Sequence, residues 1–251
     1  MNEQERNEIL EKSKEFFREQ IVTNHIKNIK KLSKQSAFNI NPFIHKYLAK
    51  STYGDTSPES LAKVLILPRV LGTSISTIFG TKMQDYCGTV LSGNGSLVPG
   101  MDIEFIDCVD NKKKYCQIKS GPQTINRDDV KTITDHFKSA IRLSRTNNCK
   151  VTSENCVVGV LYGEASDLSA HYREISKDFP VFTGREFWYR LTGDKDFYDK
   201  LADAFAEAAS DIQSTDVSDI IESTIKKLAK TFETNNEEDN GESAEEKGVE
   251  S

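Results

Sequence analysis

The stretch Gly100-Met101-Asp102-Ile103-Glu104, followed after a short basic segment by Gln117-Ile118-Lys119-Ser120-Gly121, decides the fold of this 251-residue chain. Both halves alternate like β-strands, and the polar residues between them favour a turn, so the stretch predicts a β-hairpin. Because alternate side chains of a strand point to the same side, acids, an amide and a lysine share one face. A four-residue turn at Asp110–Lys113 would place Glu104 opposite Lys119. The apolar face behind them is expected to hold Ile103, Phe105, Cys116 and Ile118.

The composition is that of a chain with one sizeable core. Hydrophobic residues make up 37% of the sequence, and the formal net charge is −6. The polar, acidic N-terminus is unlike a signal peptide, and no apolar run approaches the roughly 20 residues that span a bilayer. The five cysteines lack CxxC spacing, which favours reduced thiols over a zinc site. We therefore expect a cytoplasmic protein of bacterial or archaeal type, with no membrane and no nucleotide cofactor.

The charge is unevenly distributed. Residues 233–251 hold eight acids and one lysine, and the rest of the chain is nearly neutral. We expect this acidic tail to be disordered, because it has too few apolar residues to offset the entropy cost of ordering. Residues 24–50 hold six lysines and no acid, a strip suited to DNA phosphates, although a solvated helix face is the alternative for each lysine. The candidate phosphate contacts in the strip are Lys27, Lys30, Lys31 and Lys34.

Apolar periodicity divides the chain into helices and strands. The continuous apolar run Cys156–Tyr162 predicts a strand buried on both faces. Asn126 is a good N-cap for the helix that follows the hairpin, and Gly93-Asn94-Gly95 predicts a flexible turn. Helices are expected over residues 3–34, 42–49, 58–70, 73–86, 126–145, 196–212 and 217–232, with a further short strand at 180–182 and a helix through 187–189. The predicted parts are an N-terminal helical arm (1–50), a core (51–195), C-terminal helices (196–232) and the acidic tail (233–251).

The polar face of the hairpin suits a divalent metal that cuts phosphodiesters. Mg²⁺ prefers hard oxygen ligands, which Asp102, the side-chain carbonyl of Gln117 and the backbone carbonyl of Ile118 can supply. Lys119 can orient the attacking water and offset charge on the phosphate. Glu104 is a further candidate ligand or catalytic acid. The competing interpretation is a cross-strand salt-bridge cluster on a solvated sheet face.

The arrangement resembles the PD-(D/E)XK nuclease superfamily, with Asp102 in the aspartate position and Gln117-Ile118-Lys119 in the (D/E)XK position. The resemblance implies an α/β fold whose central mixed sheet is flanked by helices, here with additional N- and C-terminal helices. It also implies Mg²⁺ as cofactor, with Mn²⁺ able to substitute.

Four further blocks resemble one group of type II restriction endonucleases, which cut interrupted palindromes of the GGNCC kind as homodimers. They occur in the group's order and are Asn39-Ile40-Asn41-Pro42-Phe43, Ile66-Leu67-Pro68-Arg69-Val70-Leu71-Gly72, Val157-Val158-Gly159-Val160-Leu161-Tyr162-Gly163 and Gly184-Arg185-Glu186-Phe187-Trp188. The resemblance implies a Mg²⁺-dependent endonuclease acting on double-stranded DNA. Residues 3–34 and 197–232 would supply the dimer interface and arms around the duplex. Ser120, Thr124 and Asn126 either contact the DNA backbone or cap the next helix.

Gln117 departs from the superfamily pattern, which has Glu or Asp there. The amide keeps an oxygen ligand but loses one negative charge, worth on the order of 4 kcal/mol at an effective dielectric of about 20. We expect Glu104, or less favourably Asp85, to compensate. A repair or recombination nuclease of the same superfamily, or an inactive DNA-binding module, are the alternative functions. The four histidines lack ligand spacing and are expected to be structural or surface groups, namely His25, His45, His136 and His171.

Overall fold

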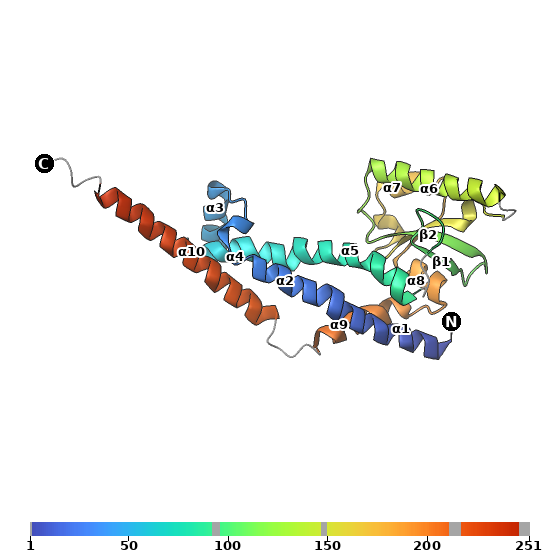
Figure 1. Cartoon of the computed structure of the whole chain (residues 1–251), viewed down its shortest axis with the longest axis horizontal. Helices are drawn as coiled ribbons and strands as arrows, with labels where there is room; N and C mark the ends of the chain where they lie inside the picture. The colour runs from blue at the N-terminus through green and yellow to red at the C-terminus, as the bar shows by residue number, and fades with distance from the viewer. Residues whose placement is uncertain (1, 92–95, 147–149, 211–216, 246–251) are drawn as a thin grey trace. The chain divides into compact units, whose positions relative to one another are not determined.

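The computed structural model describes residues 2–91, 96–146, 150–210 and 217–245, which fall into two compact units (Figure 1). We call residues 1–18 and 79–209 the sheet unit, and residues 19–78 and 210–251 the helical unit. This division differs from the predicted one. The first helix belongs with the sheet because Ile9 enters the core there, whereas Ile66 packs in the core of the helical unit.

The sheet unit is built on a four-stranded mixed sheet in the order β1-β2-β3-β4. The first two strands form the predicted hairpin and are antiparallel, whereas the pairs β2–β3 and β3–β4 are parallel. The predicted α/β class with a mixed sheet is thus confirmed. The strands are β1 (Ile103–Ile106), β2 (Lys113–Lys119), β3 (Cys156–Val160) and β4 (Val181–Thr183).

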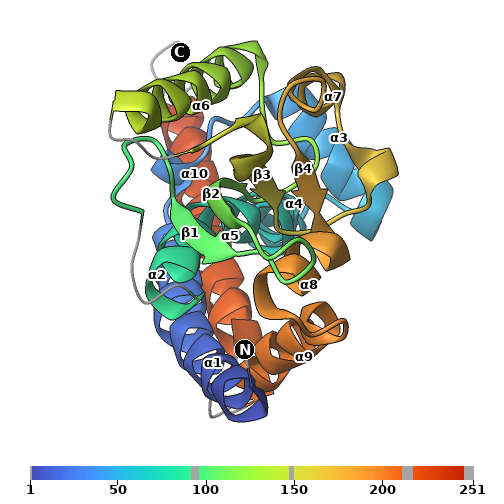
Figure 2. The ribbon, with the colours of Figure 1, turned by 90° about the vertical axis from the view of Figure 1, so that its right-hand side faces the viewer.

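Helices cover both faces of the sheet (Figure 2). On one face, α6 and α7 pack against alternate residues of β3, including Val158. On the other, Val157 and the apolar face of the hairpin contact α1, α5, α8 and α9. The strand β3 is therefore buried on both faces, as its continuous apolar run predicts. The bounds are α1 (Glu3–Phe16), α5 (Ile75–Tyr86), α6 (Arg127–Thr146), α7 (Ala170–Ile175), α8 (Gly184–Thr192) and α9 (Phe197–Ser210), with short helical segments at Cys87–Leu91, Ser153–Asn155 and Ala165–Asp167.

Six residues, 107–112, connect the two strands, and the centre of the turn lies two residues earlier in the chain than predicted. Glu104 pairs with Tyr115, so the predicted pairing of Glu104 with Lys119 is wrong. The cause is Asp107, which is fully buried and accepts hydrogen bonds from the Val109 amide (2.9 Å) and from Arg190 of α8 (2.8 Å). Because the shift is even, every side chain keeps its predicted face. The shift instead changes which polar groups meet.

The helical unit is a bundle around one apolar core. The helices α2, α4 and α10 contribute Ile29, Ile66 and Leu228 to this core. The ring of His45 on α3 contacts the Leu61 carbonyl oxygen at 2.7 Å. The elements of the unit are α2 (Thr23–Lys31), a turn at Gln35–Ala37, α3 (Pro42–Tyr53), α4 (Pro58–Pro68) and α10 (Val217–Glu245), with π-helical segments at Phe17–Val22 and Arg69–Ser74.

Two stretches of helix extend further than expected. The backbone is helical to Glu245, into the predicted disordered tail, because glutamate is itself a good helix former. Pro58–Val90 is helical throughout and is, within the described ranges, the one helix long and apolar enough to cross a membrane. Core helices of soluble proteins pass the same test, and this one supplies Ile66 and Met83 to two apolar cores. The predicted Gly93-Asn94-Gly95 turn lies outside the described residues.

Candidate active site

Asp102 lies where the first strand of the hairpin begins, next to the end of the second. Its backbone amide donates to the Cys116 carbonyl (2.9 Å), and its carboxylate oxygen Oδ2 accepts from the Ile118 amide (2.6 Å). The side chain therefore takes the place of a ladder hydrogen bond. Burial raises the pKa of Asp102, and the Ile118 amide and the charge of Lys119 oppose that effect only in part. A desolvated carboxylate of this kind favours a nearby cation.

Gln117 occupies the next position across the hairpin and is only 8% exposed. Its amide nitrogen Nε2 donates to the Gly100 carbonyl and lies 2.7 Å from Nδ1 of His136 on α6. A carbonyl oxygen only accepts, so the group facing Gly100 must be the NH₂, which fixes the orientation of the amide. The other amide atom, Oε1, is buried and has no hydrogen-bond partner among the residues that the structure describes. A buried oxygen without a partner is rare and costly.

A tight turn brings the Gly100 carbonyl to this position. The Met101 amide donates to the Val98 carbonyl (3.1 Å), and Gly100 has φ +81°. Pro99 followed by a glycine with positive φ is the pattern of a type II turn. A Cβ added to Gly100 would lie 2.5 Å from Cγ of His136. Position 100 therefore requires glycine for two reasons, namely its backbone angle and the close approach of the His136 imidazole.

Lys119 ends β2, and its Nζ lies 3.5 Å from Oδ1 of Asp129 at the start of α6. The other oxygen of Asp129 accepts from the Asn126 amide (2.9 Å), and the Asn126 side chain accepts in turn from the amides of Asp128 and Asp129. This is a reciprocal N-cap. The helix start thus holds the carboxylate that faces Lys119.

Glu104 does not join this group. Its carboxylate is bound by Lys113 (2.6 Å) and by the Ser96 hydroxyl (2.7 Å). Burial would raise its pKa, but these two partners outweigh burial and hold the pKa below its usual value. Glu104 does not lie opposite Lys119 as predicted, because the shifted register of the hairpin pairs Glu104 with Tyr115.

Two residues near the predicted ligands were not singled out from the sequence, namely Asp129 and His136. They lie seven residues apart on the helix face that also buries Ile133, so helical spacing was a usable signal. The candidate DNA contact Thr124 donates to the Gly121 carbonyl (2.8 Å), and Asn126 caps α6, so both have local structural roles. The candidate lysines of α2 and its end, Lys27, Lys30, Lys31 and Lys34, are all exposed, and Ser120 is half-buried.

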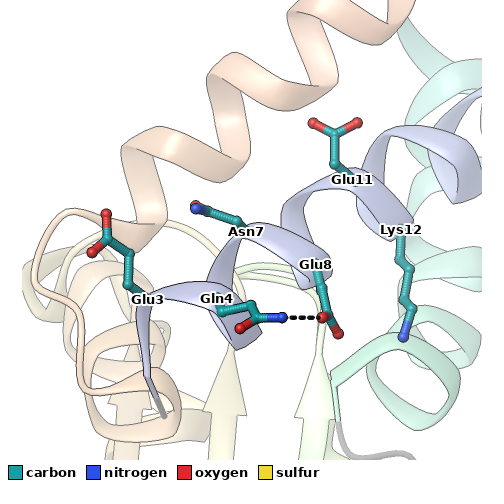
Figure 3. A pocket seen from close by; sticks show the side chains of 6 residues that line it. All are labelled: Glu3, Gln4, Asn7, Glu8, Glu11 and Lys12. Carbon is teal, nitrogen blue, oxygen red and sulfur yellow. Dashed lines mark hydrogen bonds between the residues drawn. The ribbon is translucent and has the colours of Figure 1, made fainter.

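A hollow along α1 contains none of these residues (Figure 3). It is lined by acids, amides and one lysine, and Gln4 donates to Glu8 across one turn (3.5 Å). Its acidic lining is unsuited to a polyanion, so the site at the hairpin remains the candidate.

A mixed sheet flanked by helices, with a carboxylate, an amide and a lysine gathered at its hairpin, is compatible with the fold of a nuclease. The family model of the type II restriction endonuclease EcoO109I matches residues 11–213. This match covers well over half of the chain, so the chain belongs to that family, which implies a site-specific nuclease that binds double-stranded DNA. No curated protein matches the chain.

Proposed function

We propose that the chain is a Mg²⁺-dependent type II restriction endonuclease that cuts double-stranded DNA at a short palindrome of the GGNCC kind. Its PD-(D/E)XK site consists of Asp102, Gln117 and Lys119. The observation that carries the proposal is the buried Oε1 of Gln117, which has no hydrogen-bond partner among the described residues, together with the half-buried carboxylate of Asp102 across the hairpin. Removing these oxygens of Gln117 and Asp102 from water costs free energy unless another group binds them. A cation between the protein and a DNA phosphate, near Lys119, would supply that partner.

The residues present fit Mg²⁺ or Mn²⁺. Among the described residues no three His, Cys, Asp or Glu side chains are grouped, which argues against a site made of those four types alone. An aspartate, an amide oxygen and a backbone carbonyl suit a hard cation that keeps several waters. The amide of Ile118 points toward Asp102 at the start of β1. The carbonyl of Lys119 points to the other side of β2, where it accepts from the amide of Leu161 at the end of β3 (3.0 Å). Because the amide and carbonyl of one strand residue project to the same edge, the Ile118 carbonyl belongs to the edge of Asp102.

The side chains divide the work of hydrolysis. Asp102 and Gln117 would hold the cation, which when bound neutralises charge on the phosphate and activates the attacking water. Lys119 orients that water and stabilises the charge that develops on the phosphate. Asp129 positions the ammonium of Lys119 from the start of α6. Glu104 has no part in this scheme, because Lys113 and Ser96 already bind it.

Exposed basic side chains are available to the DNA backbone. The outward side of α6 carries five of them at three-, four- and seven-residue steps, a single helix face bordered by two exposed acids, Asp128 and Asp135. They are Arg127, Lys131, Lys138, Arg142 and Arg145. The helical unit adds the exposed lysines of α2, so both units offer positive charge in a chain whose formal net charge is −6. Such surfaces bind phosphates without reading sequence.

A duplex has two strands and each chain has one site, so cutting both strands is simplest for a homodimer. The helix α3 offers a surface for the second copy. Four of its apolar side chains lie on one side and are exposed, with Phe43 85% and Tyr47 68% exposed. The other two are Ile44 and Leu48. We propose this face as a dimer contact in addition to the predicted interface on residues 3–34 and 197–232.

Plasmid digestion tests the function. The purified chain should give discrete DNA fragments with Mg²⁺ or Mn²⁺, and Asp102→Ala and Lys119→Ala should abolish them. Asp203→Ala and Lys177→Ala remove equivalent charges from exposed positions and should cut normally. Cutting of branched or nicked substrates without sequence preference would indicate a repair nuclease. DNA binding without cleavage by any divalent metal would indicate an inactive binding module.

A further inference from the structure

We infer that His136 is a positioning residue that, with the Gly100 carbonyl, locks the Gln117 amide so that its oxygen serves the metal. The inference rests on the proposed function and deepens it. Nothing in the superfamily pattern of Asp102, Gln117 and Lys119 requires a histidine on the following helix. The contact between His136 and Gln117 is a property of this chain's own residues.

The protons and acceptors around Gln117 match in number. Its NH₂ group has two protons, and two acceptors lie against it, the Gly100 carbonyl oxygen and Nδ1 of His136 at 2.7 Å. Both donors are therefore used. Because an NH₂ group only donates, Nδ1 of His136 accepts, and the imidazole proton resides on Nε2. The amide cannot flip without placing Oε1 against the Gly100 carbonyl oxygen, which can only accept.

The remaining amide atom, Oε1, is left for the metal. With the nitrogen fixed on one side, Oε1 is directed away from Gly100 and His136, and it is buried with no hydrogen-bond partner in the described part of the chain. Ligands that are held in place by hydrogen bonds lose less freedom when the metal binds, and removal of such a partner typically weakens metal affinity about 10- to 100-fold. His136 thus acts on the metal through Gln117.

The turn at Gly100 also explains why glutamine occupies position 117. A glutamate would place a carboxylate oxygen against the Gly100 carbonyl, which has no proton to offer. His136 could change tautomer to donate, but the carbonyl cannot. The glutamine is therefore matched to the turn at Gly100, and its presence is no sign of a decayed site.

Mn²⁺ binding to the full-length chain without DNA tests the inference, measured by the decrease of the free-Mn²⁺ EPR signal. His136→Leu should weaken Mn²⁺ binding about 10- to 100-fold. His136→Asn, whose side-chain oxygen can accept in place of Nδ1, should restore most of that affinity. Far-UV circular dichroism and thermal unfolding of each variant establish that it is folded.

A double-mutant cycle separates positioning from other roles. In the Gln117→Ala background, His136→Leu should have no further effect on Mn²⁺ affinity. An undiminished effect in that background would mean that His136 acts without Gln117, and an unchanged affinity in the single variant would likewise overturn the inference. If the wild-type chain bound no divalent metal and cut no DNA, the proposed function itself would fail, which is a different outcome from either.

Discussion

Truncating the most exposed aromatic side chain of α3 should separate the proposed dimer into monomers. Phe43 is 85% exposed, so nearly all of its ring is available for burial in an interface and little of it supports the fold of the single chain. Burying such a side chain is worth about 2 kcal/mol. A two-fold interface contains the residue twice, so Phe43→Ala should cost about 4 kcal/mol of dimerisation, or roughly 1000-fold in the dimer Kd.

Sedimentation equilibrium over a wide concentration range measures this shift. The matched control is Leu97→Ala, which truncates a side chain that is 96% exposed in the sheet unit, and its dimer Kd should equal that of wild type. Thermal unfolding of Phe43→Ala should match that of wild type at concentrations where both are monomeric. A dimer Kd that Phe43→Ala leaves untouched would refute the reasoning, because no other α3 side chain presents more apolar surface.

Plasmid cleavage gives a second measurement of the same prediction. A dimer delivers two sites to one duplex and produces linear DNA, whereas isolated chains cut one strand at a time. At concentrations between the two dimer Kd values, Phe43→Ala should accumulate nicked circles where wild type gives linear product. Linear product without a nicked intermediate would show that α3 is not needed to pair the two sites.

Three further predictions concern the site and the DNA surface. Asp102→Asn should abolish cleavage yet raise the stability of the metal-free protein at neutral pH. Because burial raises the pKa of Asp102 in the folded state, this residue's contribution to folding is full below the ordinary carboxyl pKa and is lost as pH rises through the raised value. Urea unfolding of both proteins at several pH values measures the difference. Gly100→Ala should destabilise the protein by about 2–5 kcal/mol, from a left-handed backbone angle and the overlap with His136, measured by urea unfolding. Replacing Lys138, Arg142 and Arg145 by Gln should make the DNA-binding constant less dependent on salt. The slope of its logarithm against the logarithm of salt concentration should become less steep by about 0.9 for each phosphate that is no longer neutralised. A slope equal to that of wild type would exclude α6 from the DNA interface.

The sequence alone was sufficient for the parts of the fold that depend on local pattern. The helix α6 begins where Asn126 predicts a cap, and β3 is buried on both faces as its apolar run indicates. The two faces of the hairpin were also predicted correctly, since the even shift of the turn preserves the alternation. Periodicity of two and of 3.6 residues is a local property, so it survives errors in pairing.

The register could not be predicted, because a distant contact sets it. Asp107 is held by Arg190, which lies 83 residues away and approaches only when α8 packs on the sheet. The shift separates Glu104 from Lys119, which the predicted register had placed opposite each other. The contact of His136 with Gln117 was missed for the same kind of reason, because it depends on a turn at Gly100 that brings one carbonyl within reach of Gln117.

The absence of a charge at Gln117 has a consequence for how the site must work. With Glu104 bound elsewhere, the side chains proposed to hold the cation supply one formal negative charge, that of Asp102. Lys119 lies near enough to lower the pKa of Asp102, so it also repels a cation there. A divalent ion in the proposed site would therefore keep most of its charge until another anion arrives, and we expect a DNA phosphate to be that anion. Because coupling between two ligands is reciprocal, phosphate strengthens metal binding by the same factor as metal strengthens phosphate binding. In the proposed site, the glutamine would make metal binding depend more on the substrate than an acidic residue would, and the hydrogen bonds that we infer from Gly100 and His136 would keep this weaker ligand in place until metal and phosphate are both bound.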